Sequence, residues 1–226
     1  MSISKVYEEF LQYFQKEDKE RSVNFLMQLL SHGELSVVDC YTKILTPALY
    51  AIAGNTKKQE ITISQEHIRT GIARTIVECC YPYVIAERNM NYCIPEKERK
   101  KIIVLCPEEE YHEIGPRMVA DFFTLHHYNT IFVGGNTPRE DFAKILSSIQ
   151  PDYVAISVSN YYNLVVAKRM IERVKKELDK KAKIIVGGYA VISKQVKKEE
   201  LGADYLFSSY DDIKMLSKED YKDVCS

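Results

Sequence analysis

The 226-residue sequence contains no tryptophan, no long apolar run and almost no excess of charge of either sign. Its 31 basic and 32 acidic side chains give a net charge of −1, which provides no general attraction to nucleic acids or acidic membranes. No segment reaches the roughly 20 apolar residues that span a bilayer, and the first residues lack the pattern of a signal peptide. We therefore expect a cytoplasmic protein without direct contact to membranes or nucleic acids.

Several sequence motifs of common functional sites are also missing. The six cysteines form no C-x-x-C pair and do not cluster with histidines at zinc-ligand spacing, so we interpret them as reduced thiols. The chain lacks the G-x-G-x-x-G dinucleotide fingerprint and the G-x-x-x-x-G-K-[ST] phosphate loop. We find no catalytic dyad and do not expect an enzyme in its own right.

Residues 1–90 show the periodicity of amphipathic helices. Apolar side chains recur at helical spacing in four segments, and Ser36 and Ser64 stand where N-caps of the third and fourth helices are expected. The predicted apolar stripe of the fourth helix consists of Ile68, Ile72, Ile76 and Cys79. Four such helices with short connections favour an antiparallel four-helix bundle.

The pattern changes after a polar, charge-rich segment at 91–100, which we take as a linker. Over 101–226 short apolar strands alternate with helical segments, and the first of these helices is predicted from His112 to His126. Such alternation is typical of a parallel sheet covered on both faces. The five expected strands fit a flavodoxin-like (Rossmann-like) domain, so the fold class is α + α/β. Ligands of such domains bind beyond the carboxyl ends of the strands.

Polar residues and glycines gather in the loops that follow the expected strands. The first strand is followed by CPEEEYHEIG, which contains Glu110, His112 and Gly115. The later strand ends carry Ser157, Ser159, Gly187, Gly188, Tyr189 and Ser208. Glycines let a ligand approach the backbone, and hydroxyls can satisfy its polar groups. His112 is the candidate metal ligand, although a polar residue at a helix start would also explain it.

A helical bundle followed by a five-stranded α/β domain with E-x-H-x-x-G after its first strand resembles the cobalamin-binding modules. The resemblance covers nearly the whole chain. In that family a D-x-H-x-x-G motif supplies the lower histidine ligand of cobalt, which implies this role for His112. It also implies that Ser157 and the Gly187-Gly188 pair line a slot for the displaced nucleotide tail. Neutral imidazole is a good ligand for cobalt, and Glu110 can fix its tautomer.

Within this family the chain looks most similar to the light-sensing, adenosylcobalamin-dependent transcriptional regulators, which carry Glu in place of the first Asp. Their bundle covers the upper face of the corrin with a Trp and, ten residues later, a Glu-His pair, which Glu66 and His67 match. Thr56 stands at the Trp position, and Lys57 at the position of the histidine that captures cobalt after illumination. The upper face therefore departs from the family pattern. The regulators begin with a winged-helix DNA-binding domain, whereas this sequence starts at the bundle.

Three hypotheses follow from the resemblance. The first is a cobalamin sensor that binds adenosylcobalamin and signals through a regulatory partner protein or by forming a homo-oligomer. The second is a corrinoid carrier that moves a methyl group between methyltransferases, although carriers usually keep Asp in the motif. The third is a divergent module of the same fold that binds haem, a linear tetrapyrrole or only a protein.

Overall fold

The computed structural model describes residues 1–90, 94–137, 139–178 and 181–222. The chain divides into two compact units, Met1–Glu87 and Arg88–Ser226, and each has buried apolar side chains of its own. Within the described ranges, no helix is both long enough and apolar enough to cross a membrane.

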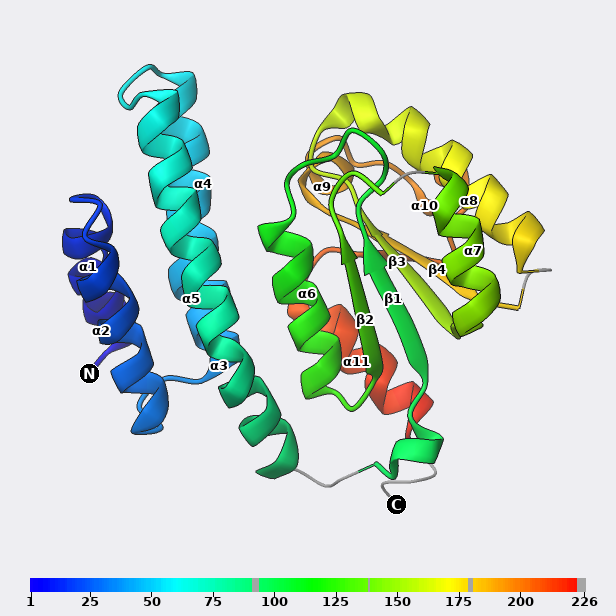
Figure 1. Ribbon diagram of the computed structural model, residues 1–226, viewed down its shortest axis with the longest axis horizontal. Coiled ribbons are helices and arrows are strands. Elements are labelled where there is room, and N and C mark those ends of the chain that lie inside the picture. The colour runs from blue at the N-terminus through cyan, green and yellow to red at the C-terminus, as the bar shows by residue number, and fades with distance from the viewer. Residues whose placement is uncertain (91–93, 138, 179–180, 223–226) are drawn as a thin grey trace. The chain divides into compact units, whose positions relative to one another are not determined.

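The first unit is built of helices, as Figure 1 shows. Its elements are α1 (Ile3–Phe14), α2 (Lys19–Ser31), α3 (Val37–Asp39), the π-helical turn η1 (Cys40–Leu45), α4 (Thr46–Lys57) and α5 (Ile63–Met90), of which the last three residues fall in the second unit. Because α3, η1 and α4 follow one another without interruption, they form the third of the four segments that the periodicity predicts. The helical prediction for this part of the chain is confirmed.

The caps of the third and fourth segments differ in how well they were predicted. The Ser36 hydroxyl accepts a hydrogen bond from the Asp39 N–H (3.0 Å), so this cap is confirmed. The predicted cap at Ser64 is wrong, because α5 already begins before it. Instead, Thr62 and Gln65 exchange hydrogen bonds between backbone and side chain (3.0 and 3.2 Å), in the manner of a capping box.

The buried side of α5 is also rotated relative to the predicted stripe. Ile72 and Ile76 are buried, but Ile68 is 47% exposed and Cys79 is only partly buried. Arg69, Ala73, Val77 and Cys80, each one residue after a predicted position, are buried as well, and so is Val84. Arg69 donates to the backbone carbonyl of Gln15 (3.0 Å), so this side of the helix faces the α1–α2 turn.

The second unit contains a five-stranded parallel sheet with the strand order β2-β1-β3-β4-β5. The strands are β1 (Lys101–Leu105), β2 (Asn129–Gly134), β3 (Tyr153–Ser157), β4 (Lys183–Gly187) and β5 (Tyr205–Phe207). This is the strand order of flavodoxin-like domains, so the predicted fold class is confirmed.

Helices cover both faces of this sheet. They are α6 (Ile114–Leu125), α7 (Arg139–Ile149), α8 (Leu164–Glu177), α9 (Tyr189–Ser193), α10 (Lys198–Leu201) and α11 (Tyr210–Asp220), with short 3-10 turns η2 (Glu96–Glu98) and η3 (Tyr161–Asn163). In Figure 1, α6 and α11 lie on one face, and α7 and α8 lie on the other. Covering both faces buries most side chains of β1, β3 and β4, which explains apolar runs such as KIIVL.

Helix α6 begins at Ile114, so the prediction that it starts at His112 is wrong. The reason is Pro116, which lies in the first turn of the helix. If the helix included His112, Pro116 would have to donate a backbone hydrogen bond to the His112 carbonyl, and proline has no N–H. His112 therefore lies in the β1–α6 loop, where its backbone is not bound by helical geometry.

A polar cluster closes the amino-terminal edge of the sheet. The buried carboxylate of Asp220 accepts hydrogen bonds from Lys100, from Tyr128 (2.6 Å) and from Tyr153 (2.9 Å). Its contacts attach the end of α11 to the start of β1. Of the predicted linker, residues 91–93 lie outside the described residues, whereas Ile94 is buried and belongs to the second unit.

Candidate functional site

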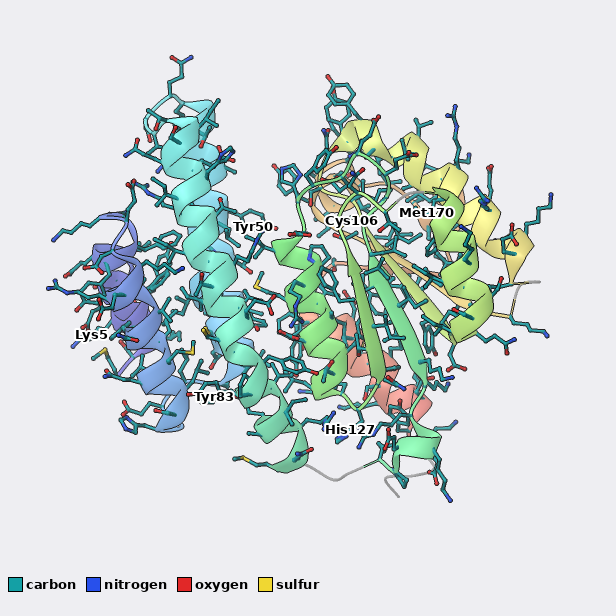
Figure 2. The ribbon with its side chains drawn as sticks, viewed as in Figure 1. Lys5, Tyr50, Tyr83, Cys106, His127 and Met170 are labelled. Atoms are coloured by element: carbon teal, nitrogen blue, oxygen red, sulfur yellow. The ribbon has the colours of Figure 1, made fainter. Side chains whose placement is uncertain are left out.

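The loops that follow β1 and β3 lie side by side at the carboxyl edge of the sheet. The two strands are neighbours, but the chain leaves β1 toward β2 and leaves β3 toward β4, in opposite directions across the sheet. Figure 2 places Cys106 at this edge, directly after β1, and His127 at the opposite end of the sheet. In open α/β sheets such a reversal opens a crevice between the two loops, and ligands bind there.

Glu110 is a buried carboxylate that joins these two loops, and its side chain is only 1% exposed. Oε1 accepts a hydrogen bond from the His112 backbone N–H (3.3 Å) and lies 2.5 Å from Nδ1 of the same residue. Oε2 accepts hydrogen bonds from the backbone N–H groups of Ser159 (3.0 Å) and Asn160 (2.8 Å) and from the Asn163 side-chain amide (3.2 Å). Donors therefore surround the buried charge, as its stability requires.

These hydrogen bonds keep Glu110 ionised. Burial alone would raise its pKa, but the hydrogen bonds from His112, Asn160 and Asn163 favour the charged form and bring the pKa down to about 2. An ionised carboxylate can only accept, so the Nδ1 atom that faces it carries the proton. Neutral His112 is thereby held in the tautomer whose Nε2 has a lone pair, which is the form that binds metals.

The imidazole of His112 stands at the protein surface, with its side chain 70% exposed. Since Nδ1 is turned toward Glu110, Nε2 is the nitrogen that would bind a metal. One imidazole supplies one ligand. It therefore suits a metal whose other positions are filled by a macrocycle, rather than a site built from several protein side chains.

The β2–α7 loop supports the His112 loop from the other neighbouring strand. The Asn136 N–H donates to the Glu110 carbonyl (2.9 Å), and the Asn136 side chain accepts from the Glu109 N–H (3.0 Å). The Gly135 N–H donates to the Glu113 carboxylate (3.3 Å). A Cβ atom at Gly135 would lie 3.0 Å from the Glu110 carbonyl oxygen, so a glycine suits this close approach. The position of Glu110 is thus fixed by the loops after three adjacent strands.

Ser157, Gly187 and Gly188 lie together at the ends of β3 and β4. Ser157 is paired with Gly187 in the sheet, and the Val158 N–H donates to the Gly187 carbonyl (2.9 Å). Gly188 has a φ of +104°, and a Cβ there would lie 2.5 Å from the Val158 carbonyl oxygen. The glycine pair therefore allows close backbone contact between two loops. Its predicted role in lining a ligand slot stays a prediction.

Ser208, Tyr189 and Gly115 were also predicted to bind the cofactor, and each has a different local environment. Ser208 donates from both its N–H (2.7 Å) and its hydroxyl (3.1 Å) to Asp212, at the start of α11. Tyr189 is the first residue of α9 and is 52% exposed. A Cβ at Gly115 would meet nothing within 4 Å, so packing within the described protein does not require glycine there. The contact of each with a cofactor stays a prediction.

The residues predicted for the upper face lie in the first unit. Glu66 and His67 belong to the first turns of α5, where Glu66 is partly buried and His67 is exposed. Thr56 lies near the end of α4, and its hydroxyl donates to the Ile52 carbonyl (3.0 Å). Lys57 is the last residue of that helix. Their role above a corrin ring stays a prediction.

Comparison with known families identifies the second unit. A model of the B12 binding domain matches residues 100–213, just over half of the chain. The chain belongs to the B12-binding domain family. All residues that surround Glu110 fall inside the matched range, so the expectation of a cobalamin-binding module is confirmed.

Similarity to individual B12-related proteins extends over most of the chain. It is 27% identical over 194 residues to a corrinoid protein of Desulfitobacterium hafniense (strain Y51), covering 83% of this chain and 84% of that protein. It is 22% identical over 207 residues to the HTH-type transcriptional repressor CarH of Myxococcus xanthus, covering 91% of this chain and 64% of CarH. The structure of the Methanosarcina barkeri monomethylamine corrinoid protein matches with a TM-score of 0.80 at 18% identity, covering 96% and 99% of the two chains.

The B12-binding domain also contains site residues that sequence reasoning missed. Asn163 is 5% exposed, and its amide donates to the Glu110 carboxylate and to the Glu109 carbonyl (3.3 Å). Asn160 contributes a backbone N–H and caps η3 by accepting from the Tyr162 N–H (3.2 Å). The only available signal was the pair of asparagines in SNYYNL after the third strand, because asparagine is favoured in turns and caps.

Proposed function

We propose that the protein binds a cobalamin with His112 as the lower ligand of cobalt, and that it serves as a corrinoid carrier of methyl groups for a methyltransferase partner. The pair formed by the exposed His112 imidazole and the buried, ionised Glu110 is the observation that carries the proposal. Bound cobalamin would supply a cobalt centre that can accept a methyl group and release it. The protein would supply the ligand and its orientation.

Each residue of the Glu110 network has a defined task in this proposal. His112 would bind cobalt through Nε2 while its Nδ1–H is held by Glu110. Glu110 would keep the imidazole in this tautomer and direction, because its own position is fixed by Ser159, Asn160 and Asn163. Ordering the ligand before binding lowers the entropy cost of ligation.

The choice of a carrier rests on the relatives and on the departures in the first unit. The corrinoid protein of D. hafniense matches along most of both chains. In addition, Thr56 and Lys57 replace the side chains on which the photochemistry of the light-sensing regulators depends. Protonated lysine is a poor metal ligand. Both observations favour a carrier over a light sensor.

A cobalamin-dependent sensor is the second candidate. The similarity to CarH over 91% of this chain favours it, as does Glu110 at the position where the light-sensing regulators carry Glu. Such a sensor would bind adenosylcobalamin and signal through a partner protein or its own assembly.

Titration of the purified protein separates these functions. The protein would be mixed in the dark with hydroxocobalamin or adenosylcobalamin, desalted and examined by visible spectroscopy, with His112→Ala as the matched variant. We expect a retained corrinoid whose histidine-ligated spectrum is lost in the variant. Chemical reduction followed by methyl iodide should methylate the bound cobalamin, and turnover of this methyl group by a methyltransferase would favour the carrier. A change in mass by light scattering after green light would favour the sensor. A colourless wild-type protein after desalting would overturn both, and haem and linear tetrapyrroles would be tested next.

A further inference from the structure

Most of the exposed large hydrophobic side chains in the described part of the second unit gather at the carboxyl edge of the sheet. They belong to the loops or helix starts that follow β1, β3 and β4. The residues are Tyr111, Tyr161, Tyr162, Val165, Tyr189 and Ile192. Single exposed hydrophobic residues need no explanation, but a group on the edge that also carries the candidate metal ligand indicates a binding surface.

Tyr161 and Tyr162 are the two members of this group whose rings contact each other. Their ring centroids are 3.8 Å apart with an angle of 35° between the rings, although the residues are 46% and 69% exposed. The Lys194 ammonium lies 5.1 Å from the centroid of the Tyr161 ring. The Asn160 side chain caps the turn that carries the pair. The two rings therefore contact each other at the surface, next to the Lys194 ammonium.

The turn that carries the tyrosine pair is part of the frame that orients His112. Three donors of the β3–α8 loop, from Ser159, Asn160 and Asn163, bind the same Glu110 carboxylate that holds the imidazole. Tyr161 and Tyr162 lie between the second and third of these residues in the sequence. A macrocycle bound through His112 would be wider than the imidazole, and the β3–α8 loop is joined to His112 through the shared Glu110 carboxylate.

We propose that Tyr161 and Tyr162 form a contact surface for the periphery of the corrinoid bound at His112. This inference rests on the proposed function and adds a second point of recognition, away from the metal. Aromatic rings provide large apolar contact area with little loss of side-chain entropy, and the phenol hydroxyls can bond the amide side chains of a corrinoid. The link through Glu110 favours the corrinoid over a partner protein as the occupant.

The experiment compares cobalamin binding by the wild-type protein with the double variants Tyr161→Ala/Tyr162→Ala and Tyr161→Phe/Tyr162→Phe. Hydroxocobalamin would be titrated in the dark, and Kd measured from the visible spectrum and from the intrinsic tyrosine emission, which no tryptophan obscures. Met215→Ala is the matched control, since Met215 is 57% exposed in α11 of the same unit. Circular dichroism would verify folding of each variant.

We expect the alanine pair to raise Kd about tenfold or more, while the histidine-ligated spectrum at saturation stays unchanged. The Met215 control should remain within about threefold of wild type, and the phenylalanine pair, which keeps the rings but loses the hydroxyls, should raise Kd less than the alanine pair does. If the alanine pair does not fold, Tyr162→Ala alone should raise Kd by about threefold or more. A wild-type protein that binds cobalamin together with an unchanged Kd in the alanine variants would overturn the inference alone. Absence of binding by the wild type would instead overturn the proposed function.

Discussion

Replacing Glu110 by Gln would test the arrangement of the whole site, because Gln keeps the shape but has one acceptor oxygen instead of two. In the wild type one carboxylate oxygen faces two N–H groups of His112, and the other faces donors from Ser159, Asn160 and Asn163. In either orientation the Gln amide NH2 group faces donors. The better orientation keeps the carbonyl toward the three donors and turns the NH2 group toward His112.

In that orientation the variant loses two hydrogen bonds to a charged acceptor, each worth about 1.5–3 kcal/mol. The imidazole can recover one bond by changing tautomer, so that Nδ1 accepts from the amide. We therefore expect the free energy of unfolding of Glu110→Gln to fall by about 2–4 kcal/mol. The proton then lies on Nε2, which can no longer bind a metal in the neutral imidazole.

Urea unfolding of the ligand-free protein and nitrogen-15 NMR of its histidines would measure the two effects separately. Asn163→Ala is the matched control, because it removes the amide that donates to the Glu110 carboxylate and the Glu109 carbonyl and leaves the carboxylate in place. It should cost about 1–2 kcal/mol and keep the Nδ1–H tautomer of His112. The reasoning would be refuted if Glu110→Gln lost less than about 0.5 kcal/mol and kept the wild-type tautomer.

Three other predictions concern stability. Gly188→Ala should lower the free energy of unfolding in urea by about 2–4 kcal/mol, since its Cβ would lie 2.5 Å from the Val158 carbonyl oxygen at a positive φ. Gly115→Ala is the control and should be neutral or stabilising, because a Cβ there meets nothing within 4 Å. Equal effects of the two substitutions would contradict this reasoning. Asp220→Asn should cost about 2–4 kcal/mol by thermal or urea unfolding, because three donors share the buried carboxylate. Burial, with the charges of nearby His127 and Lys214, lowers the pKa of His126 from 6.5 to about 4. Between these two pKa values the unfolded chain therefore binds more protons than the folded chain. The free energy of unfolding should fall by about 2 kcal/mol from about pH 7 to pH 5, and His126→Phe should reduce this pH dependence.

The alternation of apolar strands and amphipathic helices was readable from the sequence because burial on both faces of a sheet leaves a direct mark on side-chain polarity. The apolar run KIIVL, for example, coincides with β1. The cap and the buried side of α5 depend on packing, and the sequence predicted them less well. The Ser64 cap was wrong because α5 already begins at Ile63, and the stripe through Ile68 was wrong because Arg69 is buried instead and donates to the Gln15 carbonyl.

By itself, the sequence determined that a histidine and a carboxylate follow the first strand, at a spacing of two residues. Only the tertiary structure decided what this pair can do. Glu110 remains charged because backbone N–H groups 49 and 50 residues further along the chain point at it, together with the Asn163 amide. Every residue except proline has such an N–H group, so no side-chain pattern records where it points. Because β1 and β3 are neighbours in the sheet, these donors lie next to Glu110. Glu110 in turn fixes the tautomer of the His112 imidazole.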